Sequence, residues 1–386
     1  MSAFSDRELQ FLANAVGRHA SSGAEPVSAD DVDWARFLLL VERHRVGALV
    51  AASSTRLNLP PAVVDALAED ESVNAANYLR SRAVLDRLEA RFSAEAIDWA
   101  VLKGLAIAER YYERPSLREM IDVDLLVDRD RIADAERILA DEGFERYHPR
   151  FELDAARRAN FMALHSAFSF IRKRDGAQLD LHWRTVQNPR FLPQLDAVWW
   201  DHVVRREDRP WPVLREDVHF TYVLVHGAKH GWARLKWLVD IDRMLAGLDA
   251  SGAEALVQCI HDNAIPDLAG AAFTLCETIL GTAIPPALAA LSKPEGANRL
   301  CALSLRLIEH DIPHGGAGLD DAAYLATRIR HSLGLSSNRG YRRQALLLEL
   351  ARPTDLGAVP LPAGWGGALA VVSPLMALGQ TFRRSA

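Results

Sequence analysis

The stretch Ile121-Asp122-Val123-Asp124-Leu125-Leu126-Val127 decides the fold, because it is too short and too rich in branched apolar residues to be a free-standing helix. A second run of this kind, Asp98-Trp99-Ala100-Val101-Leu102-Lys103-Gly104, precedes it. Helical spacing fills residues 105–112 between the two runs and residues 129–142 after them. The sequence therefore predicts the order strand, helix, strand, helix.

Two further strands are predicted downstream as a hairpin. Residues 168–172 and 178–183 are short apolar runs, and Asp175-Gly176 lies between them. An Asp-Gly pair at this position is typical of a tight turn between antiparallel strands. Together with the first two strands, the hairpin predicts a mixed sheet.

Helical periodicity dominates the rest of the chain, both before residue 93 and after residue 210. The expected fold class is thus α+β: a small mixed β-sheet core flanked by N-terminal and C-terminal all-helical sections. We expect three parts, namely an N-terminal helical section (1–92), a sheet-containing core (93–210) and a C-terminal helical domain (211–386).

Composition excludes several classes of protein. Three cysteines without a CxxC pair argue against a disulfide framework or a zinc site, and a net charge of -6 gives no positive field for nucleic acid. We find no secretory signal and no uncharged run as long as a membrane span, so a cytoplasmic location is expected. The apolar run 368–378 is interpreted as a tail packed on its own domain, with contact to a membrane surface as the alternative.

Three aspartates are the candidates for chemistry. Asp122 and Asp124 lie two apart in a strand, so their side chains share one face. Two adjacent carboxylates repel unless a cation or a shared proton relieves them, and hard oxygen donors favour Mg²⁺. Asp180, on the second hairpin strand, reaches the same place if that strand lies beside the first pair. Three carboxylates could then bind two metal ions; the alternative is a solvated strand end.

A phosphate-binding bend is predicted just before the aspartate pair. In Leu102-Lys103-Gly104-Leu105 a strand ends in glycine where a helix begins, and free amides at such a point favour phosphate oxygens. A phosphate site beside a metal site is what nucleotide chemistry requires.

The ordered combination of these motifs resembles a known family. LKG at 102–104 is followed by an arginine and DVDLLV, then by LDLHWR at 179–184 and HGAKHGWARLKWLVDID at 226–242. Over roughly Trp34 to Leu245 the chain is similar to the uncharacterised nucleotidyltransferase family of the DNA polymerase beta-type nucleotidyltransferase superfamily.

This resemblance implies a small mixed sheet carrying two magnesium ions and a nucleoside triphosphate. By similarity Asp122 and Asp124 match the paired metal ligands, Asp180 matches the third carboxylate, and Gly104 matches the glycine of the triphosphate loop. The superfamily usually has glycine or serine after that glycine, whereas this chain has Leu105. Here the preceding residue, Lys103, offers a positive charge to the phosphates instead.

Other polar residues near these motifs have two interpretations each. Arg118 either contacts phosphate oxygens with its planar guanidinium or braces the metal pair from behind. His182 and Arg184 follow Asp180; His182 is expected to hydrogen-bond a metal carboxylate, and a packed structural histidine is the alternative.

A basic segment follows in the helical back section. Lys229 and His230, with Arg234 and Lys236, are expected to approach the nucleotide and offset its charge, and a solvated basic face is the alternative. His226 and His230 are four apart, a spacing that can bind zinc, but the catalytic glutamate of a zinc hydrolase is absent between them.

The residues and the resemblance together predict a metal-dependent nucleotidyltransferase. It would transfer a nucleoside monophosphate from a nucleoside triphosphate to an unidentified small-molecule, peptide or protein acceptor, releasing pyrophosphate. The alternative is a non-catalytic nucleotide-binding or interaction module that keeps the fold. Polymerisation of nucleic acid would need a basic groove, which the acidic balance does not favour.

Overall fold

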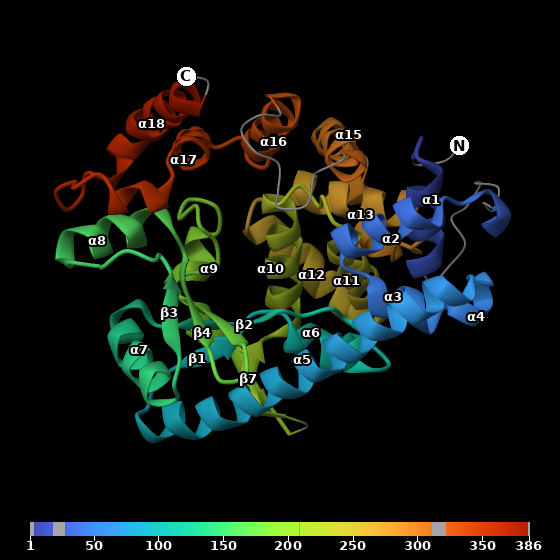
Figure 1. The fold of residues 1–386 in the computed structure, drawn as a ribbon, viewed down its shortest axis with the longest axis horizontal. Helices are drawn as coiled ribbons and strands as arrows, with labels where there is room; N and C mark the ends of the chain where they lie inside the picture. The colour runs from blue at the N-terminus through green and yellow to red at the C-terminus, as the bar shows by residue number, and fades with distance from the viewer. Residues whose placement is uncertain (1–3, 18–27, 208, 293, 311–321, 385–386) are drawn as a thin grey trace. The chain divides into compact units, whose positions relative to one another are not determined.

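The protein is described from a computed structural model that covers residues 4–17, 28–207, 209–292, 294–310 and 322–384, with side chains to residue 377 (Figure 1). The chain divides into two compact units. Unit 1 comprises Met1–Ala83, Lys103–Ile121 and Leu214–Leu335, and unit 2 comprises Val84–Leu102, Asp122–Val213 and Ser336–Ala386. Each unit consists of segments that are separate in the sequence. From the sequence we instead expect three continuous domains, and that division stays a prediction.

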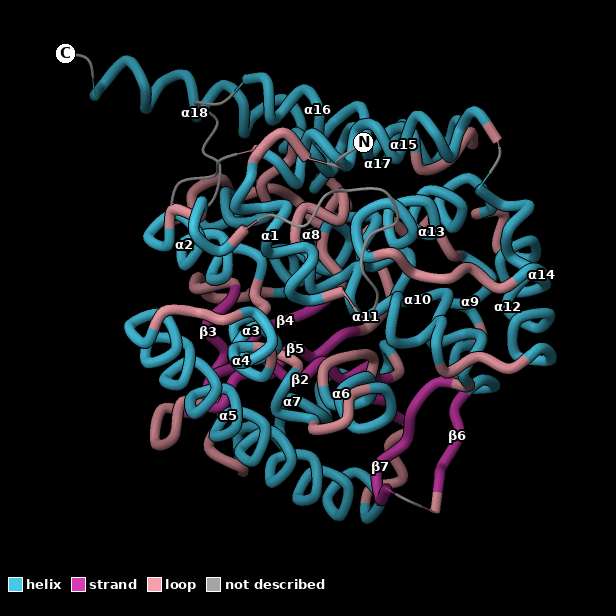
Figure 2. The backbone as a smooth tube through the Cα atoms, turned by 90° about the vertical axis from the view of Figure 1, so that its right-hand side faces the viewer, coloured by secondary structure: helices cyan, strands magenta, loops and turns pink. Residues whose placement is uncertain are grey.

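Unit 2 contains the sheet. Within the described residues, seven strands form one mixed sheet in the order β3-β4-β5-β2-β1-β7-β6 (Figure 2). The strands are β1 (Trp99–Val101), β2 (Asp122–Val127), β3 (Glu145–His148), β4 (Ala167–Arg172), β5 (Ala177–His182), β6 (Val203–Arg206) and β7 (Arg209–Leu214). This sheet with helices around it confirms the expected α+β class.

Strand alternation gives β2 and β5 one apolar face. Val123 and Leu125 of β2 and Leu179 and Leu181 of β5 are at most 2% exposed. α7 (Ile132–Asp141) and the C-terminal part of α5 (Pro61–Ala94) lie on one side of the sheet (Figures 1 and 2). The opposite face of β2 and β5 is left for the aspartates.

The hairpin is confirmed. β4 and β5 pair antiparallel, with Ser169 opposite Asp180, and Gly176 between them has the positive φ that favours glycine. Three strands were not predicted: β3, which is rich in polar residues, and β6 and β7. Prolines at 210 and 212 argue against a strand at β7, which pairs parallel with β1 at Val101 and Val213.

Unit 2 also contains helices. They are α7, α8 (Ala155–Leu164), α9 (Pro193–Ala197), α17 (Arg339–Leu350) and α18 (Leu369–Arg384), with 3-10 helices Arg129–Arg131, Trp199–His202, Pro353–Gly357 and Gly366–Ala368. In α18, Leu369 and Ser373 are buried while Val371 and Leu375 are exposed, so the apolar tail is amphipathic up to residue 377. In the part of the chain that the structure describes, no helix has the length and apolar content needed to cross a membrane.

Unit 1 is helical, as expected for the flanking sections. Its helices are α1 (Arg7–Val16), α2 (Trp34–His44), α3 (Gly47–Ala52), α4 (Ser54–Leu57), the first part of α5, α6 (Leu105–Tyr111), α10 (Glu216–Lys229), α11 (Leu235–Ala246), α12 (Ala250–Asp262), α13 (Pro266–Leu280), α14 (Pro286–Ala289), α15 (Glu295–Glu309) and α16 (Ala322–Gly334), with 3-10 helices Ala29–Asp31, Pro115–Leu117 and Ala290–Ser292. Aspartates begin several of them: Asp6, Asp33 and Asp249 each accept hydrogen bonds from backbone N–H groups of the first helical turn.

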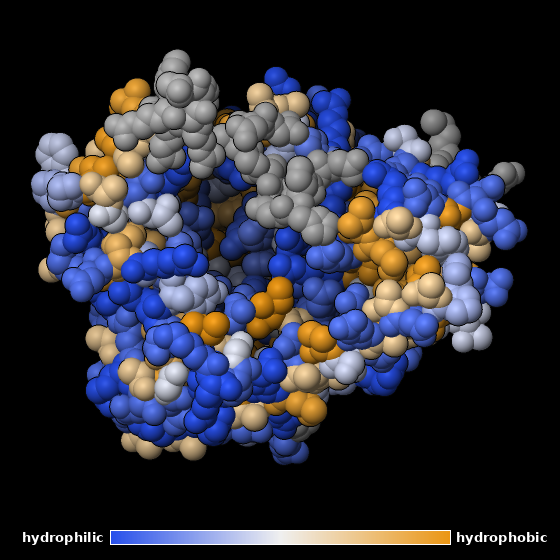
Figure 3. All heavy atoms as spheres, viewed as in Figure 1, coloured by the Kyte–Doolittle hydropathy of each residue, from blue (hydrophilic) through white to orange (hydrophobic). Residues whose placement is uncertain are grey.

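One face of the molecule shows where polar and apolar side chains lie. The face shown in Figure 3 is mainly hydrophilic, with hydrophobic side chains gathered in separate small areas.

Candidate functional site

Two aspartates face each other across neighbouring strands of unit 2. β2 and β5 run parallel with Asp124 directly opposite Asp180, and Asp122 opposite Gln178. Because side chains alternate along a strand, Asp122, Asp124, Asp180 and residue 182 all lie on the sheet face opposite the apolar one. The strand register therefore places carboxylates from two distant sequence motifs side by side.

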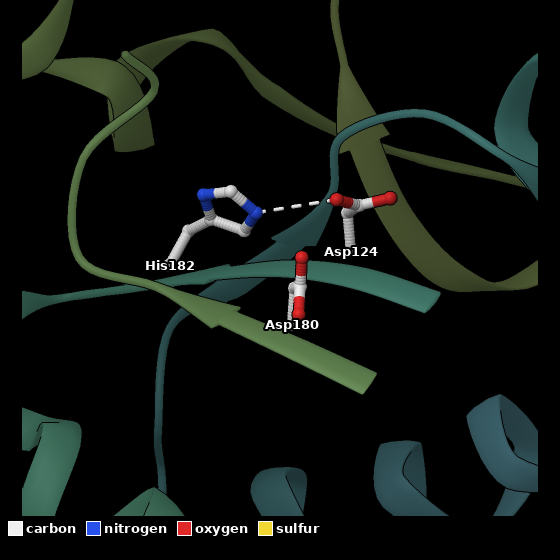
Figure 4. Close-up of side chains that lie close together, drawn as sticks. All are labelled: Asp124, Asp180 and His182. Carbon is white, nitrogen blue, oxygen red and sulfur yellow. Dashed lines mark hydrogen bonds and ion pairs between the residues drawn. The ribbon is translucent and has the colours of Figure 1, made fainter. Parts of the chain in front are cut away.

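His182 completes this group. Its Nε2 lies 3.2 Å from Oδ1 of Asp124, and the side chains of Asp124, Asp180 and His182 converge in Figure 4. One donor atom from each of the three lies within 4.8 Å of the others, and Asp122 is outside this group. Among the described residues this is the group of histidine, cysteine and carboxylate side chains with the spacing of a metal site.

The negative charges of the group repel one another. Burial raises the pKa of the Asp180 carboxyl, and the negative charges of Asp124 and Asp122 raise it further. His182 and a hydrogen bond from Ser169 act in the opposite direction without cancelling the shift. Asp124 is itself only 1% exposed. Buried like charges of this kind need a counter-charge or a shared proton.

The donor set fits a divalent cation. Carboxylate oxygens are the ligands that Mg²⁺ and Mn²⁺ prefer, and imidazole is accepted by Mn²⁺ and later transition ions. The positive ion would also relieve the repulsion that raises the pKa of Asp180. Asp124, Asp180 and His182 are thus a possible metal site, and the number and identity of the ions stay predictions.

Three polar side chains around the site were not singled out from the sequence. Ser169 lies opposite Asp180 in the β4–β5 pair, and the hydroxyl of Tyr147 donates to Oε1 of Gln178 at 3.3 Å. The charges of Asp180 and Asp122 contribute to raising the pKa of Tyr147, after burial. Alternation along the predicted hairpin already places Gln178 and Ser169 on this face, but Tyr147 lies on β3, which the sequence did not reveal.

Arg184 lies just beyond β5. Its Nη2 donates to the backbone carbonyls of Met162 and of His165, the latter at 2.9 Å. Burial lowers the pKa of its guanidinium to about 10, and the charge of Asp196 opposes that shift. These contacts anchor the end of β5 to the C-terminal end of α8, and any role of Arg184 toward the metal stays a prediction.

The basic residues expected at the nucleotide gather in unit 1. His230 is exposed as a whole residue, yet burial of its ring lowers the pKa of the imidazole well below the ordinary value, and the charges of Lys229 and Lys103 act in the same direction. The ring stacks on Trp237, with centroids 4.9 Å apart and planes at 10°. Lys103 and Lys229 are therefore neighbours of one stacked histidine, although they are more than a hundred residues apart in sequence.

Arg234, which precedes α11, and Lys236 of α11 differ in what they contact. The guanidinium of Arg234 lies over the Trp237 ring, 5.8 Å from its centroid. The ammonium of Lys236 donates to the backbone carbonyl of Glu119 at 3.2 Å, and burial lowers its pKa to about 7.

His226 and His230 have no third ligand of metal-binding type among the described residues, so the zinc alternative gains no support.

Gly104 has a backbone that requires glycine. Its φ of 67° and ψ of -109° precede α6, and a side chain at this position would be strained. The glycine that the sequence motif singles out is thus needed for the backbone conformation itself.

Arg118 is held by an aspartate of the helical section, in unit 1. Its Nε and Nη2 donate to the two carboxylate oxygens of Asp240, each at 2.8 Å, and the Tyr112 hydroxyl donates to Oδ1 of Asp240 at 2.8 Å. Both charged side chains are at most 5% exposed. The pairing partner is Asp240 of α11, and contact of Arg118 with phosphate stays a prediction.

Comparison with known proteins gives one finding. No curated protein matches the sequence. The model of a protein family described as uncharacterised nucleotidyltransferase matches residues 30–281, about two thirds of the chain. The matched segment includes β2, β5, the aspartates and the basic residues around His230. On this match and on the sheet that positions its carboxylates, the chain belongs to the uncharacterised nucleotidyltransferase family.

Proposed function

We propose that the chain is a divalent-metal-dependent nucleotidyltransferase, which transfers a nucleoside monophosphate from a nucleoside triphosphate to an acceptor and releases pyrophosphate. The observation that carries the proposal is the parallel pairing that sets Asp124 opposite Asp180 on a polar sheet face. A family of nucleotidyltransferases and a carboxylate pair, of which Asp124 is buried and Asp180 partly buried, point to the same chemistry.

The aspartates would hold the metal ions. Asp124 and Asp180 belong to the cluster with His182, and Asp122, two residues before Asp124 on the same face, would be the third carboxylate. We expect two Mg²⁺ ions. When bound, such ions neutralise triphosphate oxygens and lower the pKa of an acceptor hydroxyl.

Side chains of the protein would support the transfer itself. The acceptor oxygen would form a bond to the α-phosphorus while the bond from that phosphorus to the leaving pyrophosphate breaks. The Asp180 carboxylate would accept the proton of the acceptor hydroxyl. Lys103 follows directly on Leu102, whose N–H donates to the backbone carbonyl of Asp124 at 3.1 Å, so chain connectivity favours Lys103 as a contact for the phosphates. Lys229 and His230 would add further positive charge and a stacking surface.

The acceptor is a small molecule, a peptide or a protein. Nucleic acid is not expected, because the net charge is -6 and acids and bases are interspersed.

The test is a search for donor and acceptor together. The purified protein is incubated with a cell extract and each of the four nucleoside triphosphates, and mass spectrometry seeks an acceptor heavier by one nucleotide. Asp124→Asn and Asp180→Asn should lower the yield by on the order of a hundredfold or more, since each removes charge stabilisation at the reacting phosphate.

A matched control keeps the test specific. Asp98 is an exposed carboxylate one residue before β1, and Asp98→Asn should leave the yield unchanged. Full activity of an Asp124→Asn/Asp180→Asn double variant contradicts the proposal. Metal-dependent nucleotide binding without pyrophosphate release, under every acceptor tried, would instead favour the non-catalytic nucleotide-binding module.

A further inference from the structure

We propose that the imidazole of His182 is a direct metal ligand and makes this site prefer Mn²⁺ to Mg²⁺. The inference rests on the proposed function, because it concerns an ion bound at the same aspartates. It goes further in assigning the histidine a bond to the ion rather than a hydrogen bond to a carboxylate.

The spacing of the donors suits one octahedral ion. Ligands at the 2.0–2.1 Å typical of Mg²⁺, or slightly longer, are about 3 Å apart when adjacent and about 4.2 Å apart when opposite. Nε2 of His182 and Oδ1 of Asp124 are 3.2 Å apart, and the whole group falls within 4.8 Å. The 3.2 Å separation matches an edge of a single coordination sphere, and the 4.8 Å limit on the others is close to its diagonal.

A hydrogen bond to Asp124 alone explains less. The same 3.2 Å separation fits an N–H donated to the carboxylate, but bracing one carboxylate does not require a ring nitrogen near the second. Here a nitrogen of His182 lies within 4.8 Å of an oxygen of Asp180 as well, and the ring is turned toward both aspartates in Figure 4. The imidazole therefore occupies a corner of the donor group.

Burial supports the assignment. His182 is 5% exposed, so its ring exchanges contact with water for contact with the donor group. Its Nδ1 is buried and has no hydrogen-bond partner among the described residues. The polar contact that the ring makes among the described residues is therefore the one at Nε2, toward Asp124.

The consequence is metal selectivity. Mg²⁺ strongly prefers oxygen donors, while Mn²⁺ accepts an imidazole together with carboxylates. A site of two carboxylates and one imidazole should thus bind Mn²⁺ on the order of tenfold or more tightly than Mg²⁺.

The test is pulsed electron paramagnetic resonance of Mn²⁺ bound to tag-free protein at one equivalent. We expect the electron spin echo of bound Mn²⁺ to be modulated by a nitrogen nucleus. This modulation should change from the ¹⁴N to the ¹⁵N pattern when the protein is labelled with ¹⁵N-histidine. This measurement uses the unsubstituted protein, so it does not depend on the folding of any variant.

Two substitutions identify the nitrogen. His182→Asn should abolish the modulation and weaken Mn²⁺ binding about tenfold or more while changing Mg²⁺ binding about threefold or less. His261→Gln, at an exposed histidine of α12, should change neither.

Each other outcome overturns the inference in a recognisable way. Bound Mn²⁺ without nitrogen modulation, or modulation that persists in His182→Asn, shows that His182 is not a ligand and leaves the proposed function standing. Failure of both Mn²⁺ and Mg²⁺ to bind, even with a non-hydrolysable nucleoside triphosphate, removes the inference and the proposed function together.

Discussion

Replacing Arg118 by methionine should lower the free energy of unfolding by about 3–5 kcal/mol, because it leaves the buried carboxylate of Asp240 without its cation. The two side chains make a bidentate pair with both distances at 2.8 Å, and Asp240 is 1% exposed. Burial and the Asp240 charge also raise the pKa of the Tyr112 hydroxyl well above its usual value, so Tyr112 remains a donor but cannot replace the lost charge.

The double variant separates the pair from its parts. Arg118→Met/Asp240→Met should cost far less than the sum of the single substitutions, since two apolar side chains in place of a buried ion pair are often nearly neutral. Urea unfolding followed by circular dichroism gives the four free energies of the cycle. Arg215 and Asp217 form a control pair with the same bidentate geometry, and Arg215 is 53% exposed, so Arg215→Met should cost under about 1 kcal/mol.

The result that refutes this reasoning is an Arg118→Met variant as stable as the parent protein. Loss of nucleotide binding in such a stable variant would assign Arg118 to the phosphates instead. Strong destabilisation of Arg118→Met, with a large coupling energy between Arg118 and Asp240, would give Arg118 a structural role in the interior of unit 1.

Three further predictions concern stability. His331 is buried and hydrogen-bonded to Ser304 Oγ at 3.0 Å, and burial lowers its pKa to about 4. Because the unfolded chain protonates this histidine near pH 6.5 while the folded chain keeps it neutral, the free energy of unfolding should fall by about 2 kcal/mol between pH 7 and pH 5. His331→Gln should remove this part of the pH dependence in denaturation curves. Asn74 is 3% exposed, donates to the carbonyl of Ser116 and accepts from the N–H of Met120 at 2.9 Å, so Asn74→Leu should cost about 2 kcal/mol or more by leaving backbone groups unpaired, measured by calorimetry against the parent. Gly104→Ala should cost about 1–3 kcal/mol because its φ of 67° with ψ of -109° excludes a Cβ; an unchanged melting temperature would show that the bend relaxes freely.

The candidate site was predictable where it rests on local pattern. Alternation puts Asp122 and Asp124 on one face of a strand, and the Asp175-Gly176 turn fixes a hairpin that carries Asp180 and His182 on one face. The contact between the two motifs is confirmed by the parallel pairing of β2 and β5. Sequence pattern left this pairing conditional because either hairpin strand could have been the neighbour of β2.

The remainder depends on long-range contacts that leave little trace in the sequence. β7 reaches β1 across more than a hundred residues and contains two prolines, and β3 consists of Glu-Arg-Tyr-His at the sheet edge. Tyr147 near the aspartates was missed for that reason. The assembly of each unit from three separate segments is likewise invisible to a linear reading, since α5 runs as one helix from Pro61 to Ala94 through a unit boundary.

Hydrophobic burial on the far face of the sheet holds the aspartates together against their repulsion. Val123, Leu125, Leu179 and Leu181 are buried there, and at about 1.5–3 kcal/mol each they contribute on the order of 6–12 kcal/mol. Two carboxylates about 4 Å apart repel by roughly 1–4 kcal/mol at the effective dielectric of a partly solvated site. A register slip of β5 by one residue would relieve the charges but would turn Leu179 and Leu181 to the polar face, so burial decides the register. Folding therefore holds the two carboxylates close together before any cation binds. Binding of an ion would relieve their repulsion and would not have to bring the ligands together.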